Sequence, residues 1–476
     1  MRNLGATGNM LVRVSSLIAV GALIAAGAAV PARAMSLEEA IATAVASNPQ
    51  IGEAIYNRQA VDFQLRQAKG LFLPRIDGEL RAGRARYRSP STIPNGLEDD
   101  FNSREARITA SQPLFDGFRA LSEMQRQAAR LDSAAHRVFE RSEFIALAVA
   151  REYIDIARLR TLLSRAQQNL TFHQSILGDV TKATQGGAAS IADQQQAQER
   201  LLSAQARIEQ LRDDLSQAEA RFIQLVGLPI GPTARLAPVS SQLPRTLDEV
   251  LGIARKENPL LKIRNAELDA QLAQVKSTES VLYPRVTAEA SATKGTDINN
   301  VLGRTEDYRA EVVARWNIFN GGIDMAAREE QIRRASESRM SVSVAHREIE
   351  NEVRQSWERR IWLGRQRDSL TRQSQVSRQL LQSYQEQFRI GARSLLDLLN
   401  TQNNAFSTDA ALLTAQHAEL FSEYRLLASM GRLLKTFKVS PSTAAAADNS
   451  PRHFVPPTPP SETMPRSKGD PWFEIR

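Results

Sequence analysis

The chain consists of one unit that occurs twice. Residues 36–75 align with residues 246–285 at a constant offset of 210, and residues 114–227 align with residues 318–431 at a constant offset of 204. The two offsets differ by six, so the difference in length falls between Arg75 and Leu114. Exposed loops accept insertions, whereas helices and strands resist them. The fold is therefore expected to have two related halves, with a longer loop in the first half.

Each unit begins with two predicted helices. A short amphipathic stretch, residues 37–46 or 247–256, is followed by Asn-Pro and by a second helical stretch that ends before Pro74 or Pro284. Asparagine caps a helix N-terminus well, and proline suits the first helical position because its missing N–H has no partner there. A proline disfavours helix for the residue before it, so the chain is expected to become extended at these positions.

Two strands are predicted next in each unit. In residues 286–293 and 308–318, apolar and polar residues alternate, which indicates strands with one apolar and one polar face. The same alternation is weaker in residues 76–82 and 108–114. A β-bulge is expected near Gly83, because three arginines fall on the wrong side of the alternation there: Arg84, Arg86 and Arg88.

The rest of each unit predicts a very long helical hairpin. From residue 131 to residue 180, mostly apolar residues recur at steps of four and three, a period of 3.5 that is typical of coiled coils. The helix that carries this seam is expected over residues 118–185, and its counterpart over residues 322–390 has a weaker seam. At 1.5 Å per residue, each helix extends for roughly 100 Å. Glycines end both helices, and returning helices are expected over residues 190–226 and 394–434.

The ends of the chain lie outside the repeated units. Residues 1–34 combine early basic residues, an apolar run and Ala-Arg-Ala before Met35, which is typical of a secretory signal peptide rather than of an uncleaved membrane anchor. Residues 35–227 then form repeat 1, residues 228–245 a linker, and residues 246–438 repeat 2. Residues 439–476 are rich in proline, serine and threonine and are expected to form a disordered tail. Because the sequence contains no cysteine, we expect no disulfides and no lipid anchor at the mature N-terminus, which would require a cysteine.

The composition argues against an enzyme and against a nucleic-acid-binding protein. The five histidines are scattered without the spacing of metal ligands. No glycine-rich phosphate loop follows a strand and no nucleophile elbow is present, so no cofactor is expected. The net charge of +8 comes from charges of both signs spread over helical stretches, which is typical of solvated helix faces rather than of a nucleic-acid patch.

Four strands with one apolar face are too few to cross a membrane alone. In hydrocarbon, an open sheet edge leaves backbone N–H and C=O groups unpaired, at several kcal/mol each. Two or three copies of the chain both supply an even number of strands. A barrel of about eight strands is filled by its own side chains, whereas about twelve strands leave a lumen. Strand count alone does not choose between two and three copies; with either number, the long helical hairpins are too polar for lipid and are expected to form a helical tube that projects into the periplasm.

With these features the chain resembles the TolC family of outer-membrane factors over about residues 36–434. The resemblance rests on the duplication and on paired motifs at residues 48–49 and 258–259, 73–75 and 283–285, 112–117 and 316–322, and on residues 391–400. It implies a mainly helical chain with a transmembrane β part, three copies of which form a 12-stranded β-barrel in outer-membrane lipid and an α-helical tunnel in the periplasm. Such a homotrimer acts as a passive export duct that is gated at its periplasmic end. The partners it implies are a periplasmic adaptor protein and an inner-membrane ABC transporter or proton-driven pump. The Phe-Asn-Gly-Gly turn and the missing cysteine are most similar to the type I protein-secretion members.

The turns between the long helices and the returning helices hold the candidate functional residues. Gly187 and Gly391 are expected to provide left-handed turn geometry. Asp193 and Asp397 each lie three residues after a serine, which fits a capping box. In this motif the serine and the acid each bond the backbone N–H of the other, so the spacing alone explains both acids as helix caps.

The family resemblance adds a functional interpretation of the second turn. Three copies of Asp397 would form a carboxylate ring at the narrow periplasmic end, which favours cations and opposes a closed aperture. Asn400 stands where the family often has a second acid, so this ring is expected to be less negative. Arg393 matches a position that helps to latch the closed state through polar links to neighbouring helices, although a solvated charge explains it equally well.

Aromatic residues near the strand ends are candidates for the belts that lie at membrane interfaces. They are Tyr283, Tyr308, Trp316, Phe319 and Phe72, and simple packing explains the last of these equally well.

Two rival classes share part of the pattern. A periplasmic adaptor has one coiled-coil hairpin between compact β-domains, and a coiled-coil rod has no amphipathic strands. The sequence does not identify the cargo, which could be a protein, a polysaccharide or a small molecule.

Overall fold

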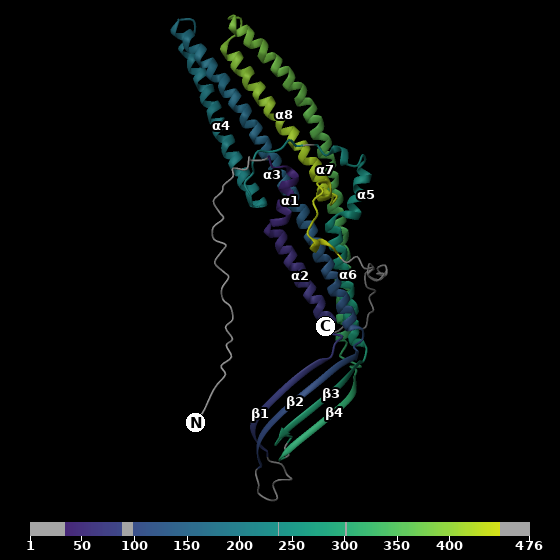
Figure 1. Ribbon diagram of the computed structural model, residues 1–476. Helices are drawn as coiled ribbons and strands as arrows, with labels where there is room; N and C mark the ends of the chain where they lie inside the picture. Colours follow the sequence, from purple (N-terminus) through teal and green to yellow (C-terminus); the bar gives the residue numbers. More distant parts are fainter. Residues whose placement is uncertain (1–33, 88–98, 237, 300–301, 448–476) are drawn as a thin grey trace, which may run out of the picture.

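The computed structural model describes residues 34–87, 99–236, 238–299 and 302–447. A long helical part continues at one end into a four-stranded sheet (Figure 1). The strands follow one another in the order β1-β2-β3-β4, and each neighbouring pair is antiparallel. Almost all of the predicted signal segment lies outside the described residues.

The helices follow the same order in both units. The first unit contains α1 (Leu37–Ser47), α2 (Pro49–Gly70), α3 (Arg119–Gln185) and α4 (Ile191–Val226). The second contains α5 (Leu247–Glu257), α6 (Pro259–Glu279), α7 (Ile323–Arg389) and α8 (Leu395–Ser429), and the short α9 (Leu433–Thr436) follows. Asn48 and Asn258 each accept the N–H two residues further on, so both cap a helix that begins with proline.

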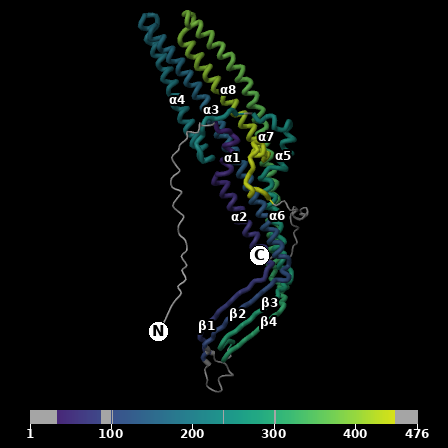
Figure 2. Tube along the Cα trace, viewed as in Figure 1, coloured from purple at the N-terminus to yellow at the C-terminus, as the bar shows by residue number. Residues whose placement is uncertain are grey.

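Two antiparallel hairpins form the long axis of the molecule. The helices α3 and α7 each span 67 residues, which corresponds to about 100 Å. The helices α4 and α8 return along them, and the two hairpins lie side by side (Figure 1; Figure 2). The predicted seam of α3 forms the core, because Val138, Ile145, Val149 and Ile156 are fully buried. The weaker seam of α7 leaves most of that helix exposed in a single chain.

The C-terminal boundaries differ from those that the sequence predicts. The helix α8 ends at Ser429 rather than near residue 434, because Gly431 adopts φ +71° and packs against the backbone of Glu257 and Asn258. The fold also continues through residues 439–447, which the sequence assigned to the tail. Val439 packs on the core, and the 3-10 turn η4 (Thr443–Ala445) contacts α3. Residues 448–476 lie outside the described part of the chain.

Hydrogen bonds hold three segments outside the long hairpins against α3: the start of the first unit, the linker between the units and the C-terminal turn. The hydroxyl of Tyr153 donates to the carbonyl of Met35 at 2.6 Å and accepts the N–H of Ala234 at 2.8 Å. The carboxylate of Glu143 accepts the N–H groups of Leu433 and Leu434, both at 3.1 Å, and its side chain is buried. Burial raises the pKa of Glu143 to about 7. The C-terminal turn is therefore anchored to a helix almost 300 residues earlier in the chain.

The bulge predicted near Gly83 is wrong. Strands β1 (Arg75–Tyr87) and β2 (Asp99–Phe115) pair without any shift of register. Arg84 and Arg86 lie beyond the apolar part of their face, where both bond Asp100. Arg88 lies outside the described residues.

The register shifts instead between β2 and β3 (Arg285–Thr296), at Pro113 and Phe115. Proline has no N–H to donate to the ladder, so it is tolerated in a sheet at such irregular positions. The fourth strand, β4 (Arg304–Arg315), pairs with β3 without a shift of register.

Candidate functional site

The four-stranded sheet has one face that is almost wholly apolar. The register keeps alternate residues of all four strands on the same side, so the apolar positions of each strand lie next to one another. The large apolar residues of this face are far more exposed than is usual on a protein surface that contacts water. The exposed fraction is 71% for Ile76, 85% for Leu80, 60% for Ile108 and 66% for Val312. The face consists of Ile76, Leu80, Ala82, Ala106, Ile108, Ala110, Ala288, Ala290, Ala292, Tyr308, Ala310, Val312 and Ala314. A contiguous apolar patch of this kind marks a surface that contacts a membrane or another protein.

The opposite face of the same sheet is charged and polar. Its charges form ion pairs: Arg81 with Glu79, Arg107 with Glu105, Arg309 with Asp307, and Arg315 with Glu289, at 2.7 to 2.9 Å. In each pair the arginine side chain is exposed to solvent. Such a face is suited to water and not to lipid.

Both edges of the sheet are open in a single chain. Among the described residues, β1 pairs only with β2, and β4 pairs only with β3. The outward N–H and C=O groups of these two edges therefore need partners wherever the surroundings exclude water.

Most of the predicted interface aromatics gather where the strands join the helices. Tyr283 makes edge-to-face contacts with Phe115 and Phe118 there. The indole Nε1 of Trp316 donates to the carbonyl of Leu282 at 3.3 Å, while Phe319 is 76% exposed.

The aromatics Phe72 and Tyr308 complete this set. Phe72 lies at the same junction and is half-exposed. Tyr308 lies within β4 opposite Ala292, and not at a strand end as the sequence suggested. Large aromatic side chains therefore occur near one margin of the apolar face and within it.

The tip of the first hairpin is built as a capped turn. Gly187 adopts φ +75°, the left-handed conformation that glycine accepts most readily. Ser190 Oγ then accepts the N–H of Asp193 at 3.1 Å, and the Asp193 carboxylate accepts the N–H of Ser190 at 3.1 Å. The hydrogen bond from the Ser190 hydroxyl lowers the pKa of Asp193. Asp193 thus completes a capping box, which accounts for this acid without any further role.

The tip of the second hairpin is organised differently around its acid. Gly391 has the same φ of +75°, and Ser394 Oγ accepts the N–H of Asp397 at 3.1 Å. The Asp397 carboxylate lies 3.9 Å from the guanidinium of Arg393, and both side chains are partly exposed. Its oxygens therefore remain accessible to ions from solvent.

Arg393 is held within its own hairpin. Its guanidinium lies over the ring of Tyr384 at 4.3 Å, and its Nε donates to Gln387 at 3.0 Å. Asn400 is exposed one turn after Asp397 on α8. The structure brings Arg393, Asp397 and Asn400 to one end of a single helix, and links from Arg393 to a second chain remain a prediction.

The two tips pack against each other. A small apolar cluster joins residues of α3 and α4 to residues of α8: Ile176, Val180, Ala197, Leu395, Leu398 and Leu399. Further along, Gln402 donates to Asn169 at 2.7 Å across the two hairpins. The acids of both tips therefore lie at the same end of the molecule, opposite the sheet (Figure 1).

In the described part of the chain, no helix has the combination of length and hydrophobicity that crossing a bilayer requires. The family model for outer membrane efflux proteins matches residues 40–228 and 250–432, and so covers both units. The chain belongs to the outer membrane efflux protein family. Its two matched segments correspond to the duplication that the sequence shows.

Curated relatives cover most of the chain at low identity. The outer membrane efflux protein BepC of Brucella suis is 24% identical over 407 residues, which is 84% of this chain and 86% of that protein. The alkaline protease secretion protein AprF of Pseudomonas aeruginosa is 24% identical over 408 residues, 83% of this chain and 84% of that protein.

Solved structures of the same architecture include the outer membrane protein VceC of Vibrio cholerae. It has a TM-score of 0.73 at 14% identity, and the match covers 83% of this chain and 96% of that chain. CusC has a TM-score of 0.72 at 18% identity, with 83% and 91% covered.

These comparisons confirm the predicted family, the mainly helical fold class with its β part, and the outer-membrane location. The protein is an outer-membrane channel component rather than an enzyme. The rival assignment to periplasmic adaptors is not supported.

Proposed function

We propose that three copies of this chain form the outer-membrane duct of a tripartite export system. The open sheet with one apolar face carries the proposal. When the β1 edge of one copy pairs with the β4 edge of the next, three sheets close into a 12-stranded barrel without free edges. The apolar face then contacts lipid, the ion-paired face lines a water-filled lumen, and the hairpins form a tunnel of about 100 Å in the periplasm.

Within this function we infer type I protein secretion, with an adaptor and an ABC transporter as partners. AprF is named as an alkaline protease secretion protein, which supports this choice. The Phe319-Asn320-Gly321-Gly322 turn and the absence of cysteine support it as well. A proton-driven pump is the second candidate partner, because BepC is named as an efflux protein.

Single-cysteine cross-linking in the native host tests the choice of partner. The chain has no cysteine, so one cysteine placed at Ala392 beside the exposed Gly391 turn reacts at a defined place. Mass spectrometry of the cross-linked complex is expected to identify an adaptor together with an ABC transporter. Recovery of an adaptor with a proton-driven pump instead would replace secretion by drug efflux and would leave the duct itself intact.

We also propose that Asp397 contributes a carboxylate ring to the periplasmic gate. A unit charge about 4 Å from a passing ion contributes about 1 kcal/mol in water, which corresponds to about fivefold in relative permeability. Asp397→Asn is therefore expected to lower the cation-to-anion permeability ratio of reconstituted channels severalfold. Asymmetric-salt reversal potentials in planar bilayers measure this ratio.

Two further variants control for this interpretation. Asn400→Asp adds a carboxylate one turn away on the same exposed side of α8 and is expected to raise the ratio. Asp213→Asn removes a carboxylate from the exposed surface of α4, about 30 Å from the tip, and is expected to change nothing. An unchanged ratio in Asp397→Asn, or an equal loss in Asp213→Asn, removes Asp397 from the gate.

A further inference from the structure

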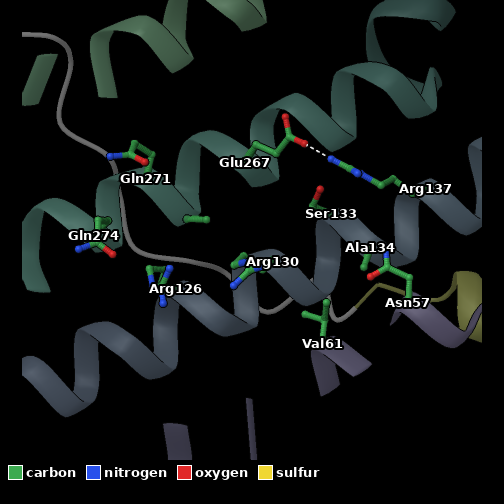
Figure 3. A pocket seen from close by; sticks show the side chains of 11 residues that line it. Asn57, Val61, Arg126, Arg130, Ser133, Ala134, Arg137, Glu267, Gln271 and Gln274 are labelled. Atoms are coloured by element: carbon green, nitrogen blue, oxygen red, sulfur yellow. Dashed lines mark hydrogen bonds and ion pairs between the residues drawn. The ribbon is translucent and has the colours of Figure 1, made fainter. Parts of the chain in front are cut away.

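A cavity of about 340 Å³ lies between α2, α3 and α6 (Figure 3). The side chains of α3 and α6 face one another across it, and α2 closes one side with Asn57 and Val61. Arg126 lies seven residues after the start of α3, so the cavity begins about 10 Å from the junction with the sheet. Nothing in the proposed gate or barrel makes use of this cavity.

Three arginines of α3 line the cavity: Arg126, Arg130 and Arg137. Together with Ser133 they recur at steps of four, three and four, which places all four on one face of the helix. Glu267 of α6 is the only carboxylate among the lining residues that the structure describes. The wall of the cavity therefore carries an excess of positive charge.

The partners of the three arginines differ. Glu123 binds Arg126 through both of its oxygens, at 2.7 and 2.8 Å. Arg137 forms an ion pair with Glu267, drawn as a dashed line in Figure 3. Arg130 forms no ion pair within the described residues, and its guanidinium makes a hydrogen bond of 3.3 Å to Gln127. Two of the guanidinium groups are thus held in ion pairs, and the third interacts with the Glu123 carboxylate only at longer range.

The second unit shows that the fold does not require this arrangement. At the offset of 204, the four positions of α3 correspond to Glu330, Arg334, Glu337 and Ser341 of α7. There, Arg334 pairs with Glu330 at 2.9 Å, and Glu337 leaves the equivalent face with one more acidic than basic residue. The run of arginines therefore reflects a property of the first unit alone.

We propose that this cavity binds an oxyanion of the phosphate type, from a phospholipid headgroup or from free phosphate. The planar fork of a guanidinium matches phosphate oxygens in bidentate geometry, and the fork of Arg130 is not used by a carboxylate at ion-pair distance, unlike those of Arg126 and Arg137. A volume of this size accommodates a small ligand group. The position beside the sheet junction also places the cavity within reach of a lipid headgroup.

The test uses the purified full-length protein and two probes. Inorganic phosphate is titrated by calorimetry into the detergent-solubilised protein, and native mass spectrometry counts phosphatidylglycerol that the protein retains from mixed vesicles. Arg130→Gln is expected to weaken binding of at least one probe by about tenfold or more, because a charge-assisted hydrogen bond is lost. Arg334→Gln, the matched position in α7, is expected to bind as the parent does.

The two probes separate the sources of the ligand. Binding of phosphate in detergent indicates a free oxyanion, and retention of phosphatidylglycerol alone indicates a headgroup. Arg130→Lys keeps the charge without the fork and is expected to be intermediate, so it provides a second variant if Arg130→Gln folds poorly. The proposal is overturned if neither probe distinguishes the parent from the Arg130 variants, or if Arg334→Gln weakens binding equally.

Discussion

Replacing Ile108 with arginine is expected to eliminate the assembled channel from the outer membrane. Ile108 lies in the middle of the apolar face, between Gly78 of β1 and Ala292 of β3. An arginine at the midplane of a lipid-facing barrel surface costs about 2–4 kcal/mol, and three copies place three such charges in one barrel. Membrane fractionation with gels of unheated and heated samples measures the loss of the assembled form.

The neighbouring residue supplies a matched control. Thr109 lies next to Ile108 but on the polar face, opposite Asp77 and Ser291. Thr109→Arg adds the same charge at the same depth and is expected to assemble normally, because an acid lies beside the new guanidinium. Normal assembly of Ile108→Arg, or equal damage from both variants, would show that the apolar face does not contact lipid.

Replacing Glu143 with leucine is expected to release the C-terminal turn from α3. The change leaves the buried N–H groups of Leu433 and Leu434 without an acceptor, at a cost of about 1–3 kcal/mol each. Hydrogen–deuterium exchange of a peptide covering residues 430–437 is expected to become much faster than in the parent. Glu140→Leu removes an acid one turn earlier on α3 that accepts neither N–H, and it should leave the protection intact.

The elevated pKa of Glu143 gives this anchor a defined pH dependence. The pKa is about 7 in the folded chain and 4.5 for an ordinary glutamate. Between these values the folded chain holds a proton that the unfolded chain has lost, so the free energy of unfolding falls as the pH rises from about 4.5 through about 7. The total loss is about 3 kcal/mol at most. Glu143→Gln is expected to remove this dependence, and an unchanged profile would assign it to other groups.

The architecture could be predicted because it is encoded in local patterns. The 3.5-residue period of residues 131–180 appears as the buried seam of α3, and the two-residue period appears as the two faces of the sheet. Asn48 and Asn258 cap the starts of α2 and α6 through hydrogen bonds from N–H groups only two residues further on. The duplication allowed the clearer second unit to guide the assignment of the first.

What the sequence misjudged or did not reveal depended on position along a strand or on contacts between distant segments of the chain. Arg84 and Arg86 suggested a bulge, but they lie on the expected face beyond the end of the apolar region. The contact of Glu143 with α9 joins segments 290 residues apart, and no periodicity reveals such a pair. At the tips, the sequence predicted the caps, whereas a ring of Asp397 side chains depends on other copies of the chain.

The number of chains around the pore tests the central claim most directly. Cryo-electron microscopy of the detergent-extracted full-length protein measures this number and shows which strands are neighbours. We predict three copies, with β1 of each copy paired to β4 of the next in a closed barrel. A particle with one copy, in which β1 and β4 both lack a neighbour from another chain, would contradict it.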